Sequence, residues 1–289
     1  VREWDLGMRP DEIAYAKAHG VPVPVSLDKP YSIDDNLWGR AIEAGVLEDP
    51  WNEPPADIWT MTVDPTEAPD EPTYVEIGFE AGVPVSLNGE QMGLVELVEQ
   101  LNGIAGAAGY GRIDMIENRY VGIKSRECYE VPAGLAIIQA HKALEDLCLE
   151  RDVLHMKLGL EQTWADQVYN GRWFSPLKQA LDAFMGATQA QLTGEVKLKL
   201  YKGSCVVVGR RSAAALYDQA LATYDNDDAF DQKAAKGFID IQALSIKTWA
   251  MKQAQLAQAE DAVSGSAQAL FGVVEGGAAE PAVAQAAAL

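Results

Sequence analysis

The sequence has few cysteines, few basic side chains and no long apolar run, and each shortage excludes a class of protein. Its three cysteines, Cys128, Cys148 and Cys205, are widely spaced and form no CxxC pair. A disulfide framework is therefore not expected, and a reducing cytoplasm is the natural setting. With 43 acidic and 23 basic side chains, the 289-residue chain has a net charge of −20. This charge repels phosphate backbones and anionic lipids and argues against nucleic-acid and membrane partners.

The common phosphate-binding motifs are absent as well. There is no GxxxxGK[ST] and no strand followed by GxGxxG; the nearest stretch, GAAGYG at 106–111, is typical of a helix cap that runs into a turn. Whole elements separate His19, His141 and His155, so no metal site is expected. We interpret His141 as a hydrogen-bonded packing residue in a helix.

Strand patterns and helix patterns are both present. Residues 73–80 (TYVEIGFE) alternate like a strand with one buried face, and a turn is predicted at Asn88-Gly89. Residues 195–211 predict a hairpin that turns at Lys202-Gly203. The order of the elements does not follow βαβ units, which favours an α+β fold with a mixed or antiparallel sheet, packed helices and a C-terminal helix. Helices are predicted at 10–20, 92–104, from Pro132 onward, up to Asn170-Gly171, from Pro176 with Ser175 as the N-cap, at 213–224 and from Lys233 into the 250s.

Composition shifts mark two further segments. Residues 30–72 are rich in proline, tryptophan and acidic side chains, which predicts an ordered but irregular segment lying over a domain. Beyond Ser264 the chain becomes rich in alanine and glycine, and disorder is expected there.

The stretch ENRYVGIKSRECYEVPAG, residues 117–134, places charged side chains between an apolar run and a helix. Ile113, Met115 and Ile116 predict a short buried strand before it, and Pro132 suits the first helical position after it. A polar cluster between a strand end and a helix start often binds small polar ligands in α/β proteins.

Two interpretations of this polar cluster remain open. In the first, the Glu117 carboxylate accepts hydrogen bonds from an amide, ureido or amino group, and Tyr129 adds a flat wall with a polar tip. In the second, Glu117, Arg119 and Arg126 form an internal salt-bridge network that braces the junction.

The predicted hairpin at 195–211 also has two interpretations. It carries five cations in an acidic protein: Lys197, Lys199, Lys202, Arg210 and Arg211. They form either a solvated sheet face or lysine-protected edge, or a patch that faces a phosphate or another subunit.

The stretch at 117–134 resembles the segment ENR-x-VG-x-KSR-x-x-YE-x-P of the argininosuccinate synthase family. The runs KPYSIDDNLWGRAIEAGVLEDPW, YNGRWFSPL, LKLYKGSCVVVGRRS and FDQKAAKGFIDIQAL resemble further blocks of that family, in the same order. The resemblance extends from about Trp4 to about Trp249.

The resemblance implies an ATP-dependent ligase of arginine biosynthesis and the urea cycle, with citrulline, aspartate and Mg²⁺-ATP as substrates. The ureido oxygen of citrulline attacks the α-phosphate and pyrophosphate leaves; the aspartate amine then displaces AMP from the citrullyl-adenylate. Carried over to this chain, Ser32, Glu117 and Tyr129 match positions that contact citrulline, and no residue is assigned as a catalyst. The family has a further serine where this chain has Ala41, a change expected to weaken citrulline binding by about 1 kcal/mol.

The same resemblance implies a cytoplasmic homotetramer. The phosphate loop of the family's N-terminal nucleotide domain does not occur in this sequence. The expected organisation is a remnant of that domain at 1–25, a synthetase domain at 26–237, an oligomerisation helix at 238–263 and a disordered tail at 264–289. Such a chain is expected to be inactive without a nucleotide domain. The alternative is a non-catalytic citrulline-binding or structural subunit.

Overall fold

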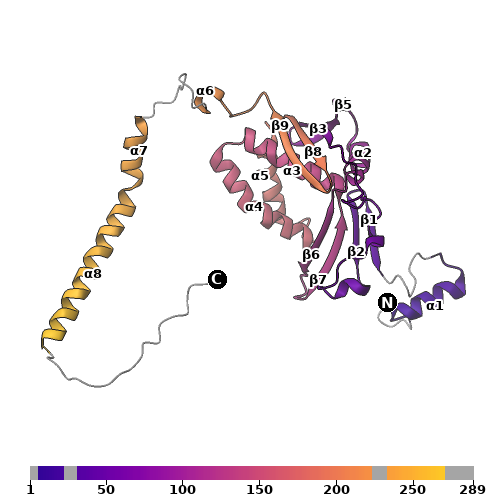
Figure 1. Ribbon diagram of the computed structural model, residues 1–289, viewed down its shortest axis with the longest axis horizontal. Helices are drawn as coiled ribbons and strands as arrows, with labels where there is room; N and C mark the ends of the chain where they lie inside the picture. Colours follow the sequence, from indigo (N-terminus) through magenta and orange to yellow (C-terminus); the bar gives the residue numbers. More distant parts are fainter. Residues whose placement is uncertain (1–5, 23–30, 223–232, 271–289) are drawn as a thin grey trace. The chain divides into compact units, whose positions relative to one another are not determined.

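The computed structural model describes residues 6–22, 31–222 and 233–270. The chain forms two compact units, residues 1–218 and residues 219–289 (Figure 1). Parts of the sequence-based expectations, at 1–5, 23–30, 223–232 and 271–289, lie outside the described residues.

The first unit contains two sheets, one of four strands in the order β1-β2-β7-β6 and one of five strands in the order β5-β4-β3-β8-β9. All of their strand pairs are antiparallel, and helices pack beside them, which confirms the predicted α+β class. The strands are β1 (Ser32–Asn36), β2 (Gly39–Glu43), β3 (Thr73–Glu80), β4 (Val83–Leu87), β5 (Glu90–Gln91), β6 (Arg112–Asn118), β7 (Lys124–Glu130), β8 (Gly194–Tyr201) and β9 (Ser204–Arg211).

Most of the predicted helices of this unit form close to their expected bounds. Ser175 caps α5 as predicted, with its side chain accepting a hydrogen bond from Lys178 N. The prediction at 213–224 begins too early, since among the described residues 213–222 the helix covers Gln219–Ala222. The α-helices are α1 (Arg9–His19), α2 (Leu94–Ala107), α3 (Pro132–Cys148), α4 (Arg151–Tyr169), α5 (Pro176–Gln189) and α6 (Gln219–Ala222), the last belonging to the second unit, and the 3-10 turns are η1 (Gly45–Glu48) and η2 (Ala56–Ile58).

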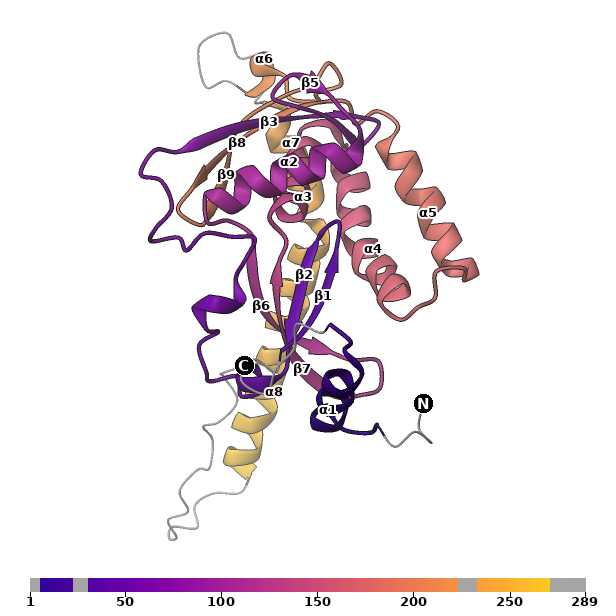
Figure 2. The same cartoon turned by 90° about the vertical axis from the view of Figure 1, so that its right-hand side faces the viewer.

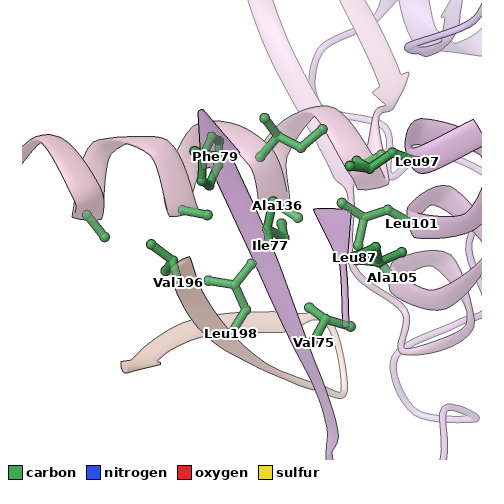
Figure 3. Packing of buried hydrophobic residues seen from close by; sticks show 14 of the residues in the cluster. Val75, Ile77, Phe79, Leu87, Leu97, Leu101, Ala105, Ala136, Val196 and Leu198 are labelled. Carbon is green, nitrogen blue, oxygen red and sulfur yellow. The ribbon is translucent and has the colours of Figure 1, made fainter. Parts of the chain in front are cut away.

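The main core lies between the five-stranded sheet and the helices α2 and α3 (Figures 2 and 3). Alternate residues of β3, namely Val75, Ile77 and Phe79, turn their side chains inward, as the period of two in the sequence predicts. Leu97 and Leu101 of α2 meet them from the helical layer and are fully buried. Burying each large apolar side chain contributes about 1.5–3 kcal/mol, so this interface holds the unit together.

The opposite face of the five-stranded sheet carries Lys197, Lys199 and Arg211 of the predicted hairpin, and Lys202 lies in the turn between β8 and β9. Lys197 pairs with Glu76 on the neighbouring strand (2.6 Å), and Lys202 pairs with Asp70 (2.7 Å). Arg211 pairs with Glu195, its cross-strand neighbour. These internal pairs favour the interpretation as a solvated sheet face.

One face of the four-stranded sheet is covered by the segment that follows β2. Ile42 and Cys128 of the sheet are buried against Leu47 and Ile58 of this segment. The covering segment is ordered, as the composition of residues 30–72 predicts. The hairpin of β1 and β2, which precedes the covering segment, was not predicted.

The carboxylate of Glu130, at the end of β7, fastens the covering segment to the sheet. The side chain is fully buried, and its oxygens accept from the backbone N–H groups of Thr60 (3.0 Å), Met61 (2.9 Å) and Thr62 (2.9 Å). They also accept from Thr62 Oγ1 (2.8 Å) and Arg40 Nη1 (3.1 Å). Five donors therefore compensate for the loss of water around one buried charge.

Two expectations for the polar stretch at 117–134 are wrong. Residues 124–130 form β7, so the stretch is largely a hairpin and not a loop between a strand and a helix. The strand predicted just before it exists as β6, but Met115 and Ile116 are 42% and 45% exposed. The sheet ends at β6, so this strand has a neighbour on one side only.

The second unit contains, beyond α6, two consecutive helices, α7 (Ala234–Gln242) and α8 (Leu244–Leu270). Apart from the half-buried Ala235, the side chains described for α7 and α8 are exposed, including Phe238 (64%), Ile241 (70%) and Trp249 (65%). Within the described parts of the chain, no helix combines the length and the apolar character that crossing a bilayer requires.

We expect Glu130→Gln to lower the free energy of unfolding by about 3–5 kcal/mol, because an amide replaces the charged acceptor of a buried network and leaves Arg40 with the exposed Asp35 as its only carboxylate partner among the described residues. Urea unfolding followed by circular dichroism measures the change. The matched control is Glu90→Gln on the exposed strand β5, which should stay within about 0.5 kcal/mol of the unsubstituted chain. Equal effects of the two substitutions would contradict the role given to Glu130.

Candidate functional site

Four positions matched citrulline-contacting positions in the sequence comparison, and the strand register places all of them on one face of the four-stranded sheet. They are Ser32, Ala41, Glu117 and Tyr129. Directly opposed residues of an antiparallel pair project to the same side, and so do residues two apart on one strand. Ser32 opposes Glu43, and Ala41 opposes both Asp34 and Tyr129. Glu117 opposes Ser125 on β7. We call this side the polar face; its residues include Ser32, Ala41, Glu43, Glu117, Ser125, Glu127 and Tyr129.

The polar face is the side left open by the covering segment. The reverse side holds Ile42, Cys128 and Glu130, which are buried under residues 44–62. On the polar face, by contrast, Ser32, Glu117 and Tyr129 are half-buried. A half-buried side chain can contact a ligand while the neighbouring side chains still restrict its conformation.

Two tyrosine hydroxyls hold the Glu117 carboxylate. The Tyr129 hydroxyl donates to Oε1, and the Tyr169 hydroxyl, at the end of α4, donates to Oε2 (2.9 Å). Burial and the hydrogen bond to Glu117 raise the pKa of Tyr129, and the hydrogen bond to Glu117 raises the pKa of Tyr169. Both phenols therefore stay protonated donors. A carboxylate has about four acceptor positions, so Glu117 can still accept from a ligand.

Arg119 organises the neighbouring part of the polar face. Its guanidinium donates to Glu43 (2.7 Å), Glu127 (2.8 Å) and the Ser125 hydroxyl (2.7 Å). Burial raises the pKa of Glu127, although the hydrogen bonds from Arg119 and Ser125 oppose this shift. One guanidinium thus serves two carboxylates, which keeps Arg119 occupied within the chain.

Arg126 lies on the reverse side and braces the covering segment. It pairs with Asp114 on β6 (2.6 Å) and donates to the backbone oxygens of Asp49 (3.0 Å) and Asn52 (2.8 Å). Neither this pair nor the Arg119 cluster includes Glu117, and no ion pair of the described residues reaches Glu117. The two interpretations of the stretch therefore each apply to different residues: the arginines brace the fold, and Glu117 with Tyr129 forms the candidate site.

The remaining chemically reactive side chains have structural partners. His141 contacts Gln189 Oε1 through Nε2 (2.9 Å), which confirms the packing role, and burial lowers the pKa of this histidine. Burial raises the pKa of the Cys128 thiol to about 11. Across residues 6–22, 31–222 and 233–270, no group of three His, Cys, Asp or Glu side chains could hold a metal ion.

The first unit has cavities beside both of its sheets. One of about 730 Å³ is bounded by strands of the five-stranded sheet and by residues 190–194, and it shares no lining residue with the candidate positions. A second, of about 660 Å³, is lined mainly by residues of the reverse side and the covering segment, such as Ile116, Arg126 and Glu48, and it reaches the polar face at Glu43 and Ser125. Only the second is continuous with residues of the polar face.

The sequence did not indicate Tyr169, and it indicated a salt-bridge role for Arg119 without its partners Glu43 and Glu127. Tyr169 lies 52 positions from Glu117 along the chain, and no spacing rule connects a helix end with a distant strand. The only available signal was its place in YNGRWFSPL, one of the runs that resemble a known family.

Comparisons with known proteins give a consistent result. The family model for the "Arginosuccinate synthase C-terminal domain" matches residues 31–249. The argininosuccinate synthase of Rubrobacter xylanophilus is 56% identical over 264 residues, which are 91% of this chain and 64% of the relative. That of Symbiobacterium thermophilum is 59% identical over 253 residues, 88% of this chain and 63% of the relative. The chain thus spans a little under two thirds of the length of these relatives.

The ion pair of Asp114 and Arg126 generates a pH prediction. The hydrogen bond from Arg126 lowers the pKa of Asp114 below its usual 3.8, so the pair stabilises the fold above that value and is lost as the pH falls through the lowered pKa. We expect Asp114→Asn to lower the free energy of unfolding by about 1 kcal/mol at pH 7, a small value because Asp114 is partly screened by water.

The difference between this variant and the unsubstituted chain should shrink as the pH approaches 3 in urea titrations. Asp34→Asn, an exposed aspartate of the same sheet, is the control and should show no such difference. If the free energy of unfolding of Asp114→Asn stayed below that of the unsubstituted chain by the same amount down to pH 3, the ion pair with Arg126 would not be the cause of the difference.

Proposed function

The chain belongs to the argininosuccinate synthase family, and from that premise we propose that it provides the citrulline-binding surface of an ATP-dependent carbon–nitrogen ligase. The reaction joins citrulline and aspartate to argininosuccinate, with AMP and pyrophosphate as the other products. It is a step of arginine biosynthesis, and we place it in the cytoplasm, where unpaired cysteines such as Cys128, Cys148 and Cys205 remain reduced.

One observation carries the proposal: the residues assigned to citrulline from the sequence share one open face. Ser32 is on β1, Tyr129 on β7 and Glu117 on β6, and the register turns all three to the polar face. Four strands about 4.8 Å apart put β1 and β6 on the order of 15 Å from each other. A long, extended amino acid could therefore contact both ends of this row.

The chemistry of these side chains suits citrulline. Its ureido and amino groups are N–H donors, and Glu117 is a carboxylate with acceptor positions left over. Ser32 adds a hydroxyl and Tyr129 a phenol that can both donate and accept. The ureido oxygen attacks the α-phosphate of ATP, so the role of these residues is to orient the ureido group and to keep it in place until the adenylate has formed.

We assign no proton transfer to the polar face. Tyr129 and Tyr169 have raised pKa values and are poor bases. We also assign none of the described residues to the phosphates of ATP, to aspartate or to Mg²⁺, which as co-substrates would be held by a nucleotide-binding part of the enzyme. The boundaries proposed for this chain are a synthetase domain at 26–237 and an oligomerisation helix at 238–263.

We further propose a homotetramer in which the helices α7 and α8 contact other copies. The support is that their apolar side chains, such as Phe238, Ile241 and Trp249, are exposed within a single copy. Covering them removes apolar surface from water, which favours association.

The function is tested by citrulline binding and by product formation. Isothermal titration of the full chain with citrulline should show binding, and Glu117→Ala should weaken it at least tenfold by removing a charged acceptor. Argininosuccinate should form from citrulline, aspartate and Mg²⁺-ATP once a separately made nucleotide-binding half is added. Binding without any product would favour a non-catalytic subunit, and the absence of binding would overturn the proposal.

Ala41→Ser is expected to strengthen citrulline binding about fivefold. Ala41 lies directly opposite Tyr129 on the polar face, and a serine there adds one neutral hydrogen bond of about 1 kcal/mol. Ala213→Ser, outside the sheet, should leave the affinity unchanged. Equal affinities of all three proteins would show that position 41 does not contact the ligand.

Light scattering tests the assembly. The unsubstituted chain should have the mass of four copies, and a chain with both Phe238→Glu and Trp249→Glu should have a smaller mass, because two charges would be buried without partners. Gln253→Glu adds a charge to α8 without removing an apolar side chain and should keep the tetramer. A monomeric unsubstituted chain would contradict this assignment.

A further inference from the structure

We propose that Tyr169 is a positioning residue of the citrulline site, whose hydroxyl sets the orientation in which Glu117 meets the substrate. The inference rests on the proposed function and extends it to a helix end for which sequence reasoning gave no role. Tyr169 would touch Glu117 and not the reacting atoms.

The contacts of Glu117 carry the proposal. Tyr169 donates to Oε2 (2.9 Å) while Tyr129 donates to Oε1, so each oxygen of the carboxylate has its own phenol. The terminal torsion of a glutamate is broad when nothing restrains it. Two donors on the two oxygens remove that freedom before a ligand arrives, which lowers the entropy that binding must overcome.

The backbone hydrogen bonds at the end of α4 fix the position of Tyr169. Tyr169 is the last helical residue, and Gly171 has a φ of 68°, a left-handed conformation that glycine adopts without strain. Arg172 N donates to Gln167 O (2.8 Å) and Gly171 N to Val168 O (3.0 Å). This pair of bonds is the Schellman motif, which ends the helix at a defined residue.

A second link joins the same helix end to the hairpin that carries Glu117. Arg172 Nη2 donates to the Tyr120 hydroxyl (2.6 Å), and its guanidinium lies 5.5 Å from the centre of the Tyr120 ring. Tyr120 follows β6 by two residues. Because β6 is the last strand of its sheet, this link restrains an edge that would otherwise be held from one side only.

A neutral donor serves this position better than a cation. Arg119 is nearby, but it is occupied by Glu43 and Glu127. Tyr169, with its raised pKa, donates without neutralising the carboxylate. The negative charge of the Glu117 carboxylate is therefore still available to attract the N–H groups of the substrate.

The test is the affinity of the full chain for citrulline, measured by isothermal titration. Tyr169→Phe keeps the ring and removes only the hydroxyl, and we expect the dissociation constant to rise about fivefold to tenfold. Tyr74→Phe is the matched control, because Tyr74 and Tyr169 are both 53% exposed and Tyr74 lies on the other sheet. It should leave the affinity unchanged, and urea midpoints of both variants should match the unsubstituted chain.

A double substitution separates positioning from a purely structural effect. If Tyr169 acts through Glu117, then adding Tyr169→Phe to Glu117→Gln should change the affinity less than twofold, because the charged acceptor is already gone. The full fivefold to tenfold loss in that background would overturn the proposal. Unchanged binding by Tyr169→Phe alone would also overturn it and leave the proposed function standing. No binding by the unsubstituted chain would overturn both.

Discussion

The buried carboxylate of Glu130 is the interaction on which the rest of the candidate site depends. It collects three backbone N–H groups of residues 60–62, the hydroxyl of Thr62 and the guanidinium of Arg40. A charge without water must be matched by donors, and four of these donors come from residues 60–62, far away in the sequence. The network thereby ties the covering segment to the reverse side of the four-stranded sheet and leaves the polar face as the side open to a ligand.

Glu130 also connects the site to the main core. It ends β7, and Pro132 opens α3 two residues later, so the strand that carries Tyr129 runs directly into the helix that packs under the five-stranded sheet. The backbone is tightly packed at this joint: a Cβ on Gly39 would lie 1.9 Å from the carbonyl oxygen of Glu130. The position of Tyr129 is therefore set by the core and not by local preference, which is what a precise binding surface requires.

The charged residues near the site fall into two groups with different tasks. Arg126 with Asp114, and Arg119 with Glu43 and Glu127, satisfy one another and hold strands and loops in register. Glu117 stands apart from these pairs and takes its hydrogen bonds from two neutral phenols. Neutral donors do not cancel the negative charge of Glu117, so its carboxylate can still attract the N–H groups of a ligand. The carboxylates that pair with arginines are already bound within the fold.

The sequence by itself determined the elements whose signals are local. Asn88-Gly89 and Lys202-Gly203 turn with positive φ at both residues, Ser175 with Pro176 starts α5, and the alternation at 73–80 is β3. The family and the identity of the citrulline candidates Ser32, Glu117 and Tyr129 also came from the order of residues. Only the tertiary structure decided that residues 124–130 are a strand, because Glu130 is buried through partners some seventy positions away. It also brought Tyr169 to Glu117, since a contact between a helix end and an edge strand depends on how the layers pack, and no local pattern in the chain records that packing.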